Sequence, residues 1–187
     1  LRDTNVMVLS DEIYAELNYG LRPHVSIASL PGMAERTIVV NGFSKTYAMT
    51  GWRLGYLRAP RWLARRIIAF QSHTTSNPTT FAQYGAIAAL EGKADKEVRH
   101  MCEEFAKRRD LVYELISAIP GVKCIRPQGA FYLLCDVSSF GMTSEEFCNR
   151  LLAEEKLAAI PCCSFGAEGQ IRLSYACSEE NIRDAAG

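Results

Sequence analysis

The chain alternates short apolar runs, rich in β-branched residues, with longer stretches in which apolar residues recur at helical spacing. Two apolar runs, 6–10 and 38–40, have the length of strands, and polar residues follow each of them. Continuous apolar runs of this length are typical of parallel strands that are covered on both faces. A third strand is expected at 54–58, just before Pro60. The first part of the chain is therefore predicted to be α/β.

Helical spacing marks three segments that follow these early strands. Helices are expected over 61–72, from Thr79 or Thr80 to about residue 91, and over 95–119. The basic run 107–109 interrupts the apolar stripe of the longest helix. A run of like charges is usually hydrated, so we expect this run to face solvent.

The longest of these helices would span on the order of 37 Å at 1.5 Å per residue, which is enough to link two domains. We place a domain boundary near Gly92, between residues 1–92 and residues 93–187. Beyond the long helix, Thr143-Ser-Glu-Glu146 has the pattern of a capping box at the start of a further helix. Short strands are expected on both sides of it, at 122–125, 131–135, 157–160 and 170–175. This second part is predicted to be a smaller α+β domain.

The composition is that of an ordinary globular protein, with 48% hydrophobic and 22% charged residues among 187. The 21 basic and 21 acidic side chains cancel, which argues against nucleic acid or an acidic membrane as a partner. No apolar run approaches the roughly 20 residues that span a bilayer, and the beginning of the chain has no signal-peptide pattern. The seven cysteines lack metal-binding spacing, which favours reduced thiols in the cytoplasm and no bound metal.

Polar side chains follow both early strands at their carboxyl ends. Asp11 and Tyr14 come directly after the first run, and Lys45 comes shortly after the second. In open α/β sheets, ligands bind outside this end of the strands, where a lysine among apolar neighbours can act as a nucleophilic amine. Asp11 by itself could equally cap a helix. Its pairing with Lys45 across one sheet favours a crevice that both residues face.

Two arginines complete the set of candidate site residues. Arg53 ends the segment that contains Lys45. Arg172 lies in an expected strand between Ile171 and Leu173, an unfavourable place for a charge without a partner. It is either an edge-strand arginine that faces solvent or a guanidinium fork that holds a carboxylate by two parallel hydrogen bonds.

The sequence Ser-Lys-Thr-Tyr-Ala-Met-Thr-Gly-Trp-Arg at 44–53 resembles the cofactor-lysine signature of the class I aminotransferases, the pyridoxal-phosphate enzymes of fold type I. The resemblance implies that Lys45 is catalytic and forms a Schiff base with pyridoxal 5'-phosphate, and that Arg53 binds the phosphate. It also implies that Asp11 keeps the pyridine nitrogen protonated and that Tyr14 binds the phenolic oxygen. All four residues are thereby assigned to the cofactor.

Ile-Arg-Leu-Ser-Tyr-Ala at 171–176 resembles a late strand of the same family, whose arginine, here Arg172, binds the substrate α-carboxylate. Segments 128–132 and 160–166 match two further family segments, which are usually backbone and packing features. The implied fold is the C-terminal part of the large pyridoxal-phosphate-dependent transferase domain, with a mostly parallel sheet, followed by a smaller α+β C-terminal domain. The resemblance also implies that the strand at 54–58 runs antiparallel to the other strands of that sheet. The implied reaction moves an amino group between an L-amino acid and a 2-oxo acid in a homodimer.

Two positions depart from the family pattern. Gly42 stands where many members have a serine that touches the phosphate, and Cys162-Cys163 replace a glycine and a serine. In addition, no counterpart of the family's phosphate loop, stacking aromatic residue or asparagine precedes Asp11. We therefore expect the chain to be a fragment of a longer enzyme, and to bind pyridoxal phosphate weakly or not at all by itself.

Three alternative functions stay open at this point. The same residues would serve a pyridoxal-phosphate-dependent carbon–sulfur β-lyase, although Thr-Gly-Trp-Arg at 50–53 favours transamination. The chain could instead belong to the aminotransferase-like sensor domain of a transcription regulator, or contribute only a dimer surface. A winged helix-turn-helix encoded upstream would indicate the regulator, whereas a phosphate loop would indicate the enzyme.

Overall fold

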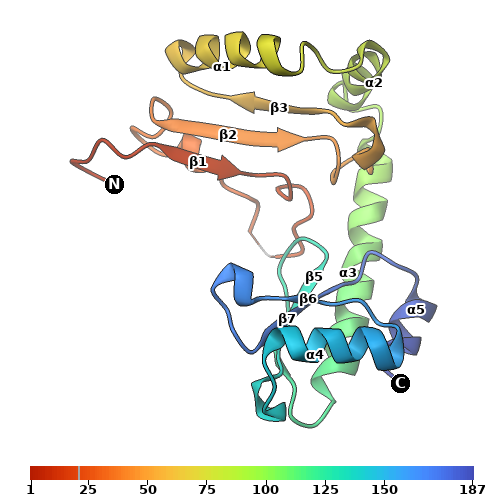
Figure 1. The fold of residues 1–187 in the computed structure, drawn as a ribbon. Coiled ribbons are helices and arrows are strands. Elements are labelled where there is room, and N and C mark those ends of the chain that lie inside the picture. The colour runs from red at the N-terminus through yellow and green to blue at the C-terminus, as the bar shows by residue number, and fades with distance from the viewer. Residues whose placement is uncertain (21) are drawn as a thin grey trace. The chain divides into compact units, whose positions relative to one another are not determined.

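The computed structural model describes residues 1–20 and 22–187, and Figure 1 shows their order of helices and strands. The chain divides into two compact units, Leu1–His100 and Met101–Gly187. Within the described residues, no helix is both long and apolar enough to cross a membrane. Each unit has its own sheet and its own core, so each is described by itself.

The sheet of the first unit has three strands in the order β1 (Val8–Asp11), β2 (Thr37–Gly42) and β3 (Gly55–Arg58). β1 pairs with β2 in parallel, whereas β2 pairs with β3 antiparallel. The three early strands are confirmed. The sheet is mixed. The parallel pairing expected of the first two strands and the antiparallel direction implied for the third are both present, so only one of the two strand pairs is parallel.

Two helices follow the sheet, α1 (Arg61–Thr74) and α2 (Thr80–Leu90). Both were predicted within a few residues. Thr79 occupies the N-cap position of α2, but its side chain makes no capping hydrogen bond there. The core of this unit joins the two ends of the β2–β3 connection to the small-residue face of α2, and its members are Phe43, Leu54, Ala82, Ala86 and Ala89.

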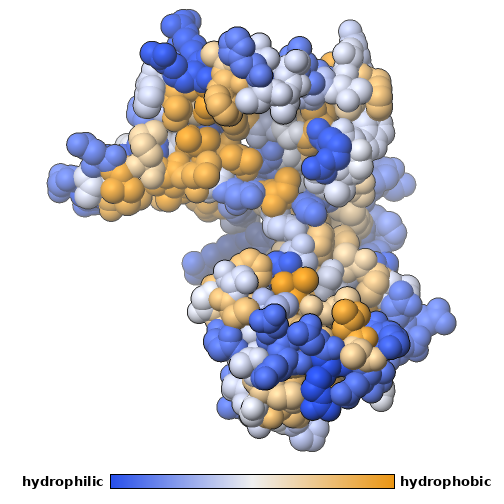
Figure 2. All heavy atoms as spheres, in the orientation of Figure 1, coloured by the Kyte–Doolittle hydropathy of each residue, from blue (hydrophilic) through white to orange (hydrophobic). Residues whose placement is uncertain are grey.

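Much of the apolar surface of the first unit is exposed. Figure 2 shows apolar side chains gathered over the region of the three-stranded sheet. α1 has no fully buried residue. Large exposed apolar side chains lie on the strands and on both helices, among them Leu9, Trp62, Ile68, Phe70, Phe81 and Leu90. Exposed apolar surface on this scale is typical of faces that other protein covers.

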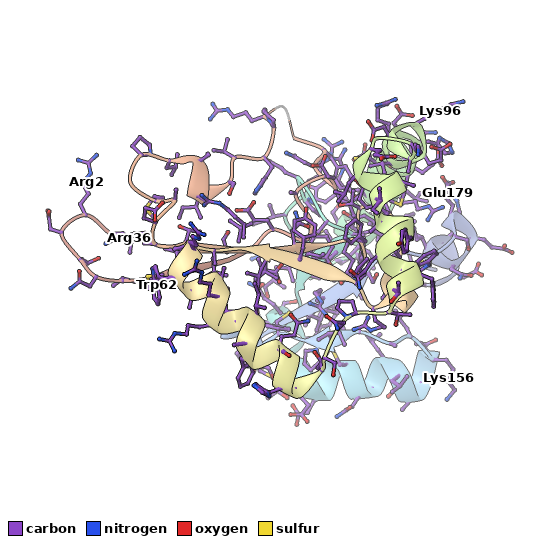
Figure 3. The ribbon with its side chains drawn as sticks, turned by 90° about the horizontal axis from the view of Figure 1, so that it is seen from above. Arg2, Arg36, Trp62, Lys96, Lys156 and Glu179 are labelled. Atoms are coloured by element: carbon purple, nitrogen blue, oxygen red, sulfur yellow. The ribbon has the colours of Figure 1, made fainter. Side chains whose placement is uncertain are left out.

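The residues before β1 are attached to the start of β2 by one side chain. The guanidinium of Arg36 donates to the carbonyl of Leu1 at 2.6 Å and also to the carbonyl of Thr4. Figure 3 labels Arg36 on the segment that leads into β2, and Trp62 near the start of α1. This contact adds to the backbone pairing that sets the register of β1 on β2.

The second unit is built on an antiparallel sheet beside the later part of α3 (Asp95–Ser117), the helix in which the two units meet. The strand order is β4-β5-β7-β6, and all three pairings are antiparallel. The strands are β4 (Lys123–Cys124), β5 (Tyr132–Asp136), β6 (Ile160–Pro161) and β7 (Gln170–Ser174), and the other helices are α4 (Ser144–Arg150) and α5 (Glu179–Asp184). The short helical turns of the chain are η1 (Ile27–Ser29), η2 (Thr50–Trp52), η3 (Ser138–Phe140), η5 (Cys163–Phe165) and the π-helical η4 (Leu151–Glu155).

Alternate residues of β5 and β7 build the core of this unit against α3. Leu133, Cys135 and Ile171 are buried together with Val112 and Ile116 of the helix. Their intervening neighbours along each strand point to the opposite face of the sheet. One face of the sheet is therefore the core, and the other carries Arg172.

The capping box at the start of α4 is confirmed. The N–H of Thr143 donates to the Glu146 carboxylate at 2.9 Å, and the N–H of Glu146 donates to the Thr143 hydroxyl oxygen at 3.2 Å. The carboxylate lies in the first turn of the helix, where the helix dipole favours it. The hydrogen bonds that its carboxylate accepts from the backbone N–H and the hydroxyl of Thr143 hold the pKa of the Glu146 carboxyl below its usual value.

The expectation that the basic run 107–109 faces solvent is wrong for Arg109. Its side chain is buried and donates to Asp110 at 2.7 Å, although Lys107 is exposed and pairs with Glu104. The reason is periodicity. Arg109 lies on the same helical face as Val112, and that face of α3 packs against the sheet.

Candidate functional site

The carboxyl ends of β1 and β2 lie at one edge of the first sheet. Asp11, the last residue of β1, pairs with Val40 of β2, and the N–H of Glu12 donates to the Val40 carbonyl at 2.8 Å. Tyr14 follows on the turn after β1, and Lys45 follows β2. The parallel pairing expected from the sequence is therefore present, and it brings both connecting segments to the same edge.

Asp11 caps a turn rather than a helix. Its carboxylate accepts the N–H of Ile13 at 3.1 Å, and the chain then turns through Tyr14, whose carbonyl accepts the N–H of Leu17 at 3.0 Å. Leu17 is fully buried and anchors the turn. The carboxylate of Asp11 is exposed, so it keeps room for a ligand.

Tyr14 and Lys45 come together at this edge. The Nζ atom of Lys45 lies 6.0 Å from the centroid of the Tyr14 ring, within the range of a cation–π contact. Both side chains are half-buried. An amine and a phenol from two different connections thus share one small region of the surface.

A compact loop between β2 and β3 carries Lys45. It is closed at its base by the N–H of Phe43, which donates to the Leu54 carbonyl at 3.4 Å, and both residues are buried. The carbonyl of Phe43 also accepts the N–H groups of Tyr47 and Met49. Because its base is part of the core, the loop presents Lys45 from a fixed position rather than from a free tip.

Arg53 belongs to the same loop. It follows η2 in the left-handed region, with φ of 55°, and its guanidinium donates to the carbonyl of Thr50 at 2.9 Å. The hydroxyl of Thr50 donates in turn to the carbonyl of Ser44 at 2.9 Å. Arg53 is therefore connected through Thr50 to the residue next to Lys45, and its side chain is exposed.

Glu12, beside Asp11, has a structural role. It is buried and accepts hydrogen bonds from the hydroxyls of Ser10 and Ser26 and from Nε2 of His24, which lies 3.1 Å from its second carboxylate oxygen. Burial would raise the pKa of the Glu12 carboxyl, but the hydrogen bonds from Ser26, His24 and Ser10 outweigh it and lower the pKa. The network holds the segment around residues 24–26 against the end of β1.

Arg172 lies in the second unit, in β7. This strand lies between β5 and β6, so the interpretation of Arg172 as an edge-strand residue is wrong. Arg172 pairs with Leu134 on one side and Ile160 on the other. Its guanidinium carbon lies 4.4 Å from the centroid of the Tyr132 ring and 5.3 Å from that of Phe165.

The two rings beside Arg172 were not identified from the sequence, which treated the segments 128–132 and 160–166 as backbone and packing features. Tyr132 is on β5 and Phe165 is on η5, so their meeting depends on the pairing of β5 with β7. A partial signal was available. Tyr132 and Arg172 fall on the same face of paired strands once the register is known.

Within the described residues, no group of three His, Cys, Asp or Glu side chains is placed to hold a metal ion. The residues that converge at the β1–β2 edge are instead an amine, a phenol and a carboxylate, with a guanidinium on the same loop. The amine and the guanidinium donate hydrogen bonds and accept none, so this set can bind an anionic group.

Comparison with known proteins identifies a family. The family model of class I and II aminotransferases matches residues 1–187. An aspartate aminotransferase of Pyrococcus abyssi is 44% identical over 184 residues, which are 97% of this chain and 47% of that protein. The aromatic-amino-acid aminotransferase 2 of Thermococcus litoralis is 41% identical with the same coverage. The chain thus spans about half the length of the curated relatives that it matches.

Solved structures agree with this match. The chain superimposes on an aromatic aminotransferase from Pyrococcus horikoshii with a TM-score of 0.92 and 43% identity, covering 96% of this chain and 48% of that one. An aspartate aminotransferase from Rhizobium meliloti gives a TM-score of 0.91 at 36% identity, covering 97% and 48%. The likeness therefore extends over nearly all of this chain.

Proposed function

The chain belongs to the family of class I and II aminotransferases, and from this premise we propose that its protein transfers amino groups between an α-amino acid and a 2-oxo acid with pyridoxal 5'-phosphate. The observation that carries the proposal is the meeting of Lys45 and Tyr14 at the carboxyl edge of β1 and β2. Asp11 and Arg53 lie on the same two connections.

These residues fit the cofactor by their chemistry. Pyridoxal phosphate has an aldehyde, a phenolic oxygen, a ring nitrogen and a phosphate, which call for an amine, a hydroxyl, a carboxylate and a cation. Lys45, Tyr14, Asp11 and Arg53 supply one of each. Arg53 uses one nitrogen, Nη1, for the Thr50 carbonyl, so the rest of its fork is available to a phosphate.

When bound, pyridoxal phosphate supplies an electron sink for negative charge at the substrate α-carbon. Lys45 would hold the cofactor by its amine, and its Nζ atom would serve as the base and acid that moves the proton at the substrate α-carbon. Asp11 would keep the ring nitrogen protonated, Tyr14 would donate to the phenolic oxygen and Arg53 would neutralise the phosphate. Arg172 holds the substrate α-carboxylate with its guanidinium fork.

We assign residues 1–92 to the large cofactor-binding domain of the family and residues 93–187 to its small domain, as the sequence predicts. The two compact units of the structure divide a few residues later, after His100. The resemblance to the family also supports a homodimer in the cytoplasm. The names of the relatives point to acidic or aromatic amino acids as the first substrates to assay. Formation of a new amino acid from an added 2-oxo acid would indicate transfer, whereas β-elimination would release ammonia and a thiol.

Borohydride trapping tests the assignment of Lys45. The full-length protein is incubated with pyridoxal phosphate, reduced, digested and mapped by mass spectrometry. We expect one predominant modified lysine, Lys45, and loss of that peptide in the Lys45→Ala variant. Lys93→Ala is the matched control, because Lys93 is an exposed lysine of the same unit that pairs with Glu91. Labelling spread over surface lysines and unchanged in Lys45→Ala would refute the proposal.

A further inference from the structure

The surroundings of Arg172 are unusual for a charged residue inside a sheet. Its direct neighbours on the paired strands are Leu134 and Ile160, both exposed and apolar. Within the described part of the second unit, its guanidinium makes no hydrogen bond and no ion pair. Its recorded contacts are with the rings of Tyr132 and Phe165, which lie 4.4 Å and 5.3 Å from its central carbon.

In this arrangement the aromatic rings can fix the orientation of the guanidinium while its hydrogen-bond donors stay available to another group. An aromatic ring attracts a cation through the electron density on its face. The N–H donors of arginine lie at the edge of its planar group and point outward within that plane. Two rings can therefore restrain the side chain of Arg172 without occupying any of its donors. A carboxylate partner within the protein would have occupied them.

The two rings come from separate parts of the unit. Tyr132 begins β5, and Phe165 ends η5, the turn that leads toward β7. Tyr132 is half-buried, whereas Phe165 is 64% exposed and adds little to the core. An exposed phenylalanine beside a cation is difficult to explain by packing alone. Its contact with the guanidinium of Arg172 explains why a ring is present at this position.

We propose that Tyr132 and Phe165 are positioning residues that clamp the guanidinium of Arg172 between aromatic rings and so present its free donors to the carboxylate of a substrate. The inference rests on the proposed function, in which Arg172 binds that carboxylate. It adds that the affinity for the carboxylate depends on two ring faces that do not themselves touch it. An arginine held in this way loses less side-chain entropy when the carboxylate binds.

The test measures binding of carboxylic acids that have no amino group and therefore cannot react. Succinate and 3-phenylpropionate are titrated into the full-length protein by calorimetry, with the wild type compared with Tyr132→Leu, Phe165→Leu, Tyr132→Phe and Arg172→Lys. We expect each leucine variant to bind the better of the two acids about two- to fivefold more weakly. Tyr132→Phe keeps the ring and should bind within about twofold of the wild type.

Unfolding by urea is followed for every variant, so that a weaker affinity is counted only where the folded state is retained. Leucine variants that bind like the wild type, beside a weakened Arg172→Lys, would overturn the clamp and leave the role of Arg172 intact. A Tyr132→Phe variant as weak as Tyr132→Leu would also overturn it, because the hydroxyl and not the ring would then matter. Unchanged binding in Arg172→Lys, or no binding of either acid by the wild type, would overturn both the clamp and the carboxylate role of Arg172.

Discussion

The indole ring of Trp52 lies so close to Gly85 that α2 has no room for a side chain at that position. A Cβ atom built on Gly85 would be 2.7 Å from Cζ3 of Trp52. The Trp52 ring also meets Phe81 of the same helix edge-on, with 6.0 Å between ring centroids. Trp52 therefore packs the loop that carries Lys45 and Arg53 against α2. This packing requires that Gly85 has no side chain.

Replacing Gly85 by alanine should displace the Trp52 ring and loosen the loop. We expect the free energy of unfolding to fall by about 1–3 kcal/mol from overpacking, reduced by up to about 1 kcal/mol because alanine favours a helix. Urea denaturation measures the change. Gly51→Ala is the control, since a Cβ at Gly51 meets no atom within 4 Å. Equal stability of the two variants would contradict the close packing of Trp52 against Gly85.

The network around Glu12 should make stability depend on pH in the acidic range. The pKa of the Glu12 carboxyl is lowered in the folded state from the ordinary 4.5. A lowered pKa contributes stability above the ordinary value, and that stability is lost as the pH falls through the folded pKa. Removing the charge by Glu12→Gln should therefore cost about 1–3 kcal/mol near neutral pH and much less in acid.

The measurement is urea denaturation of the wild type and Glu12→Gln at about pH 6 and about pH 3. Asp11→Asn, at the neighbouring exposed carboxylate, is the control and should leave stability nearly unchanged at both pH values, because its one hydrogen bond within the described residues is the turn to Ile13. A cost of Glu12→Gln that is the same at both pH values would show that the charge of Glu12 does not stabilise the fold.

Because the guanidinium of Arg109 is buried, we expect Asp110→Asn to lower the free energy of unfolding more than Arg126→Gln does. Asp110 accepts from Arg109 at 2.7 Å and from Arg126 at 2.9 Å, and these hydrogen bonds, that of Arg109 first, lower the pKa of the Asp110 carboxyl. Asp110→Asn removes the negative charge that faces the buried guanidinium of Arg109, whose contact with the Pro127 carbonyl is long at 3.5 Å. We expect it to cost about 1–3 kcal/mol.

Arg126→Gln is the matched comparison, because it removes the exposed partner of the same carboxylate. Arg126 is 54% exposed, so its pair with Asp110 should contribute about 0–1 kcal/mol. Thermal or urea unfolding of the two variants gives the order directly. A larger loss of stability for Arg126→Gln than for Asp110→Asn would mean that Asp110 does not stabilise the buried guanidinium of Arg109.

The thiols of the second unit should differ widely in reactivity. Burial, with smaller effects from nearby Cys124 and Cys162, raises the pKa of the Cys135 thiol to about 12. Cys163 is exposed on η5. Iodoacetamide at mildly alkaline pH should modify Cys163 first and leave Cys135 unmodified until the protein is unfolded, because the thiolate is the reactive form.

Peptide mapping by mass spectrometry follows this reaction, and Cys163→Ser should remove the fast-reacting peptide without exposing Cys135. Early modification of Cys135 in the folded protein would contradict its place in the core. Cys162, which neighbours Cys163 in sequence, is an internal comparison. It is buried, and burial raises the pKa of its thiol.

Local patterns in the sequence predicted the secondary structure well. The three early strands, the helices α1 to α3 and the capping box at Thr143 are all present, within a few residues of their expected bounds. Each depends on residues that are close together in the chain, because apolar periodicity and capping act over a few positions. The parallel pairing of β1 and β2 was also predictable, since both runs are continuously apolar.

The features that the sequence did not predict are contacts between residues that lie far apart in the chain. Arg109 is a member of a charged run, yet the packing of α3 on the sheet buries it. Phe165 and Tyr132 reach Arg172 only because β5, β6 and β7 pair in one register. The amino-acid order settled which residues form each element and which polar groups follow the strands. The tertiary structure decided which of those groups meet, because strand register and helix packing are set by contacts across the whole unit.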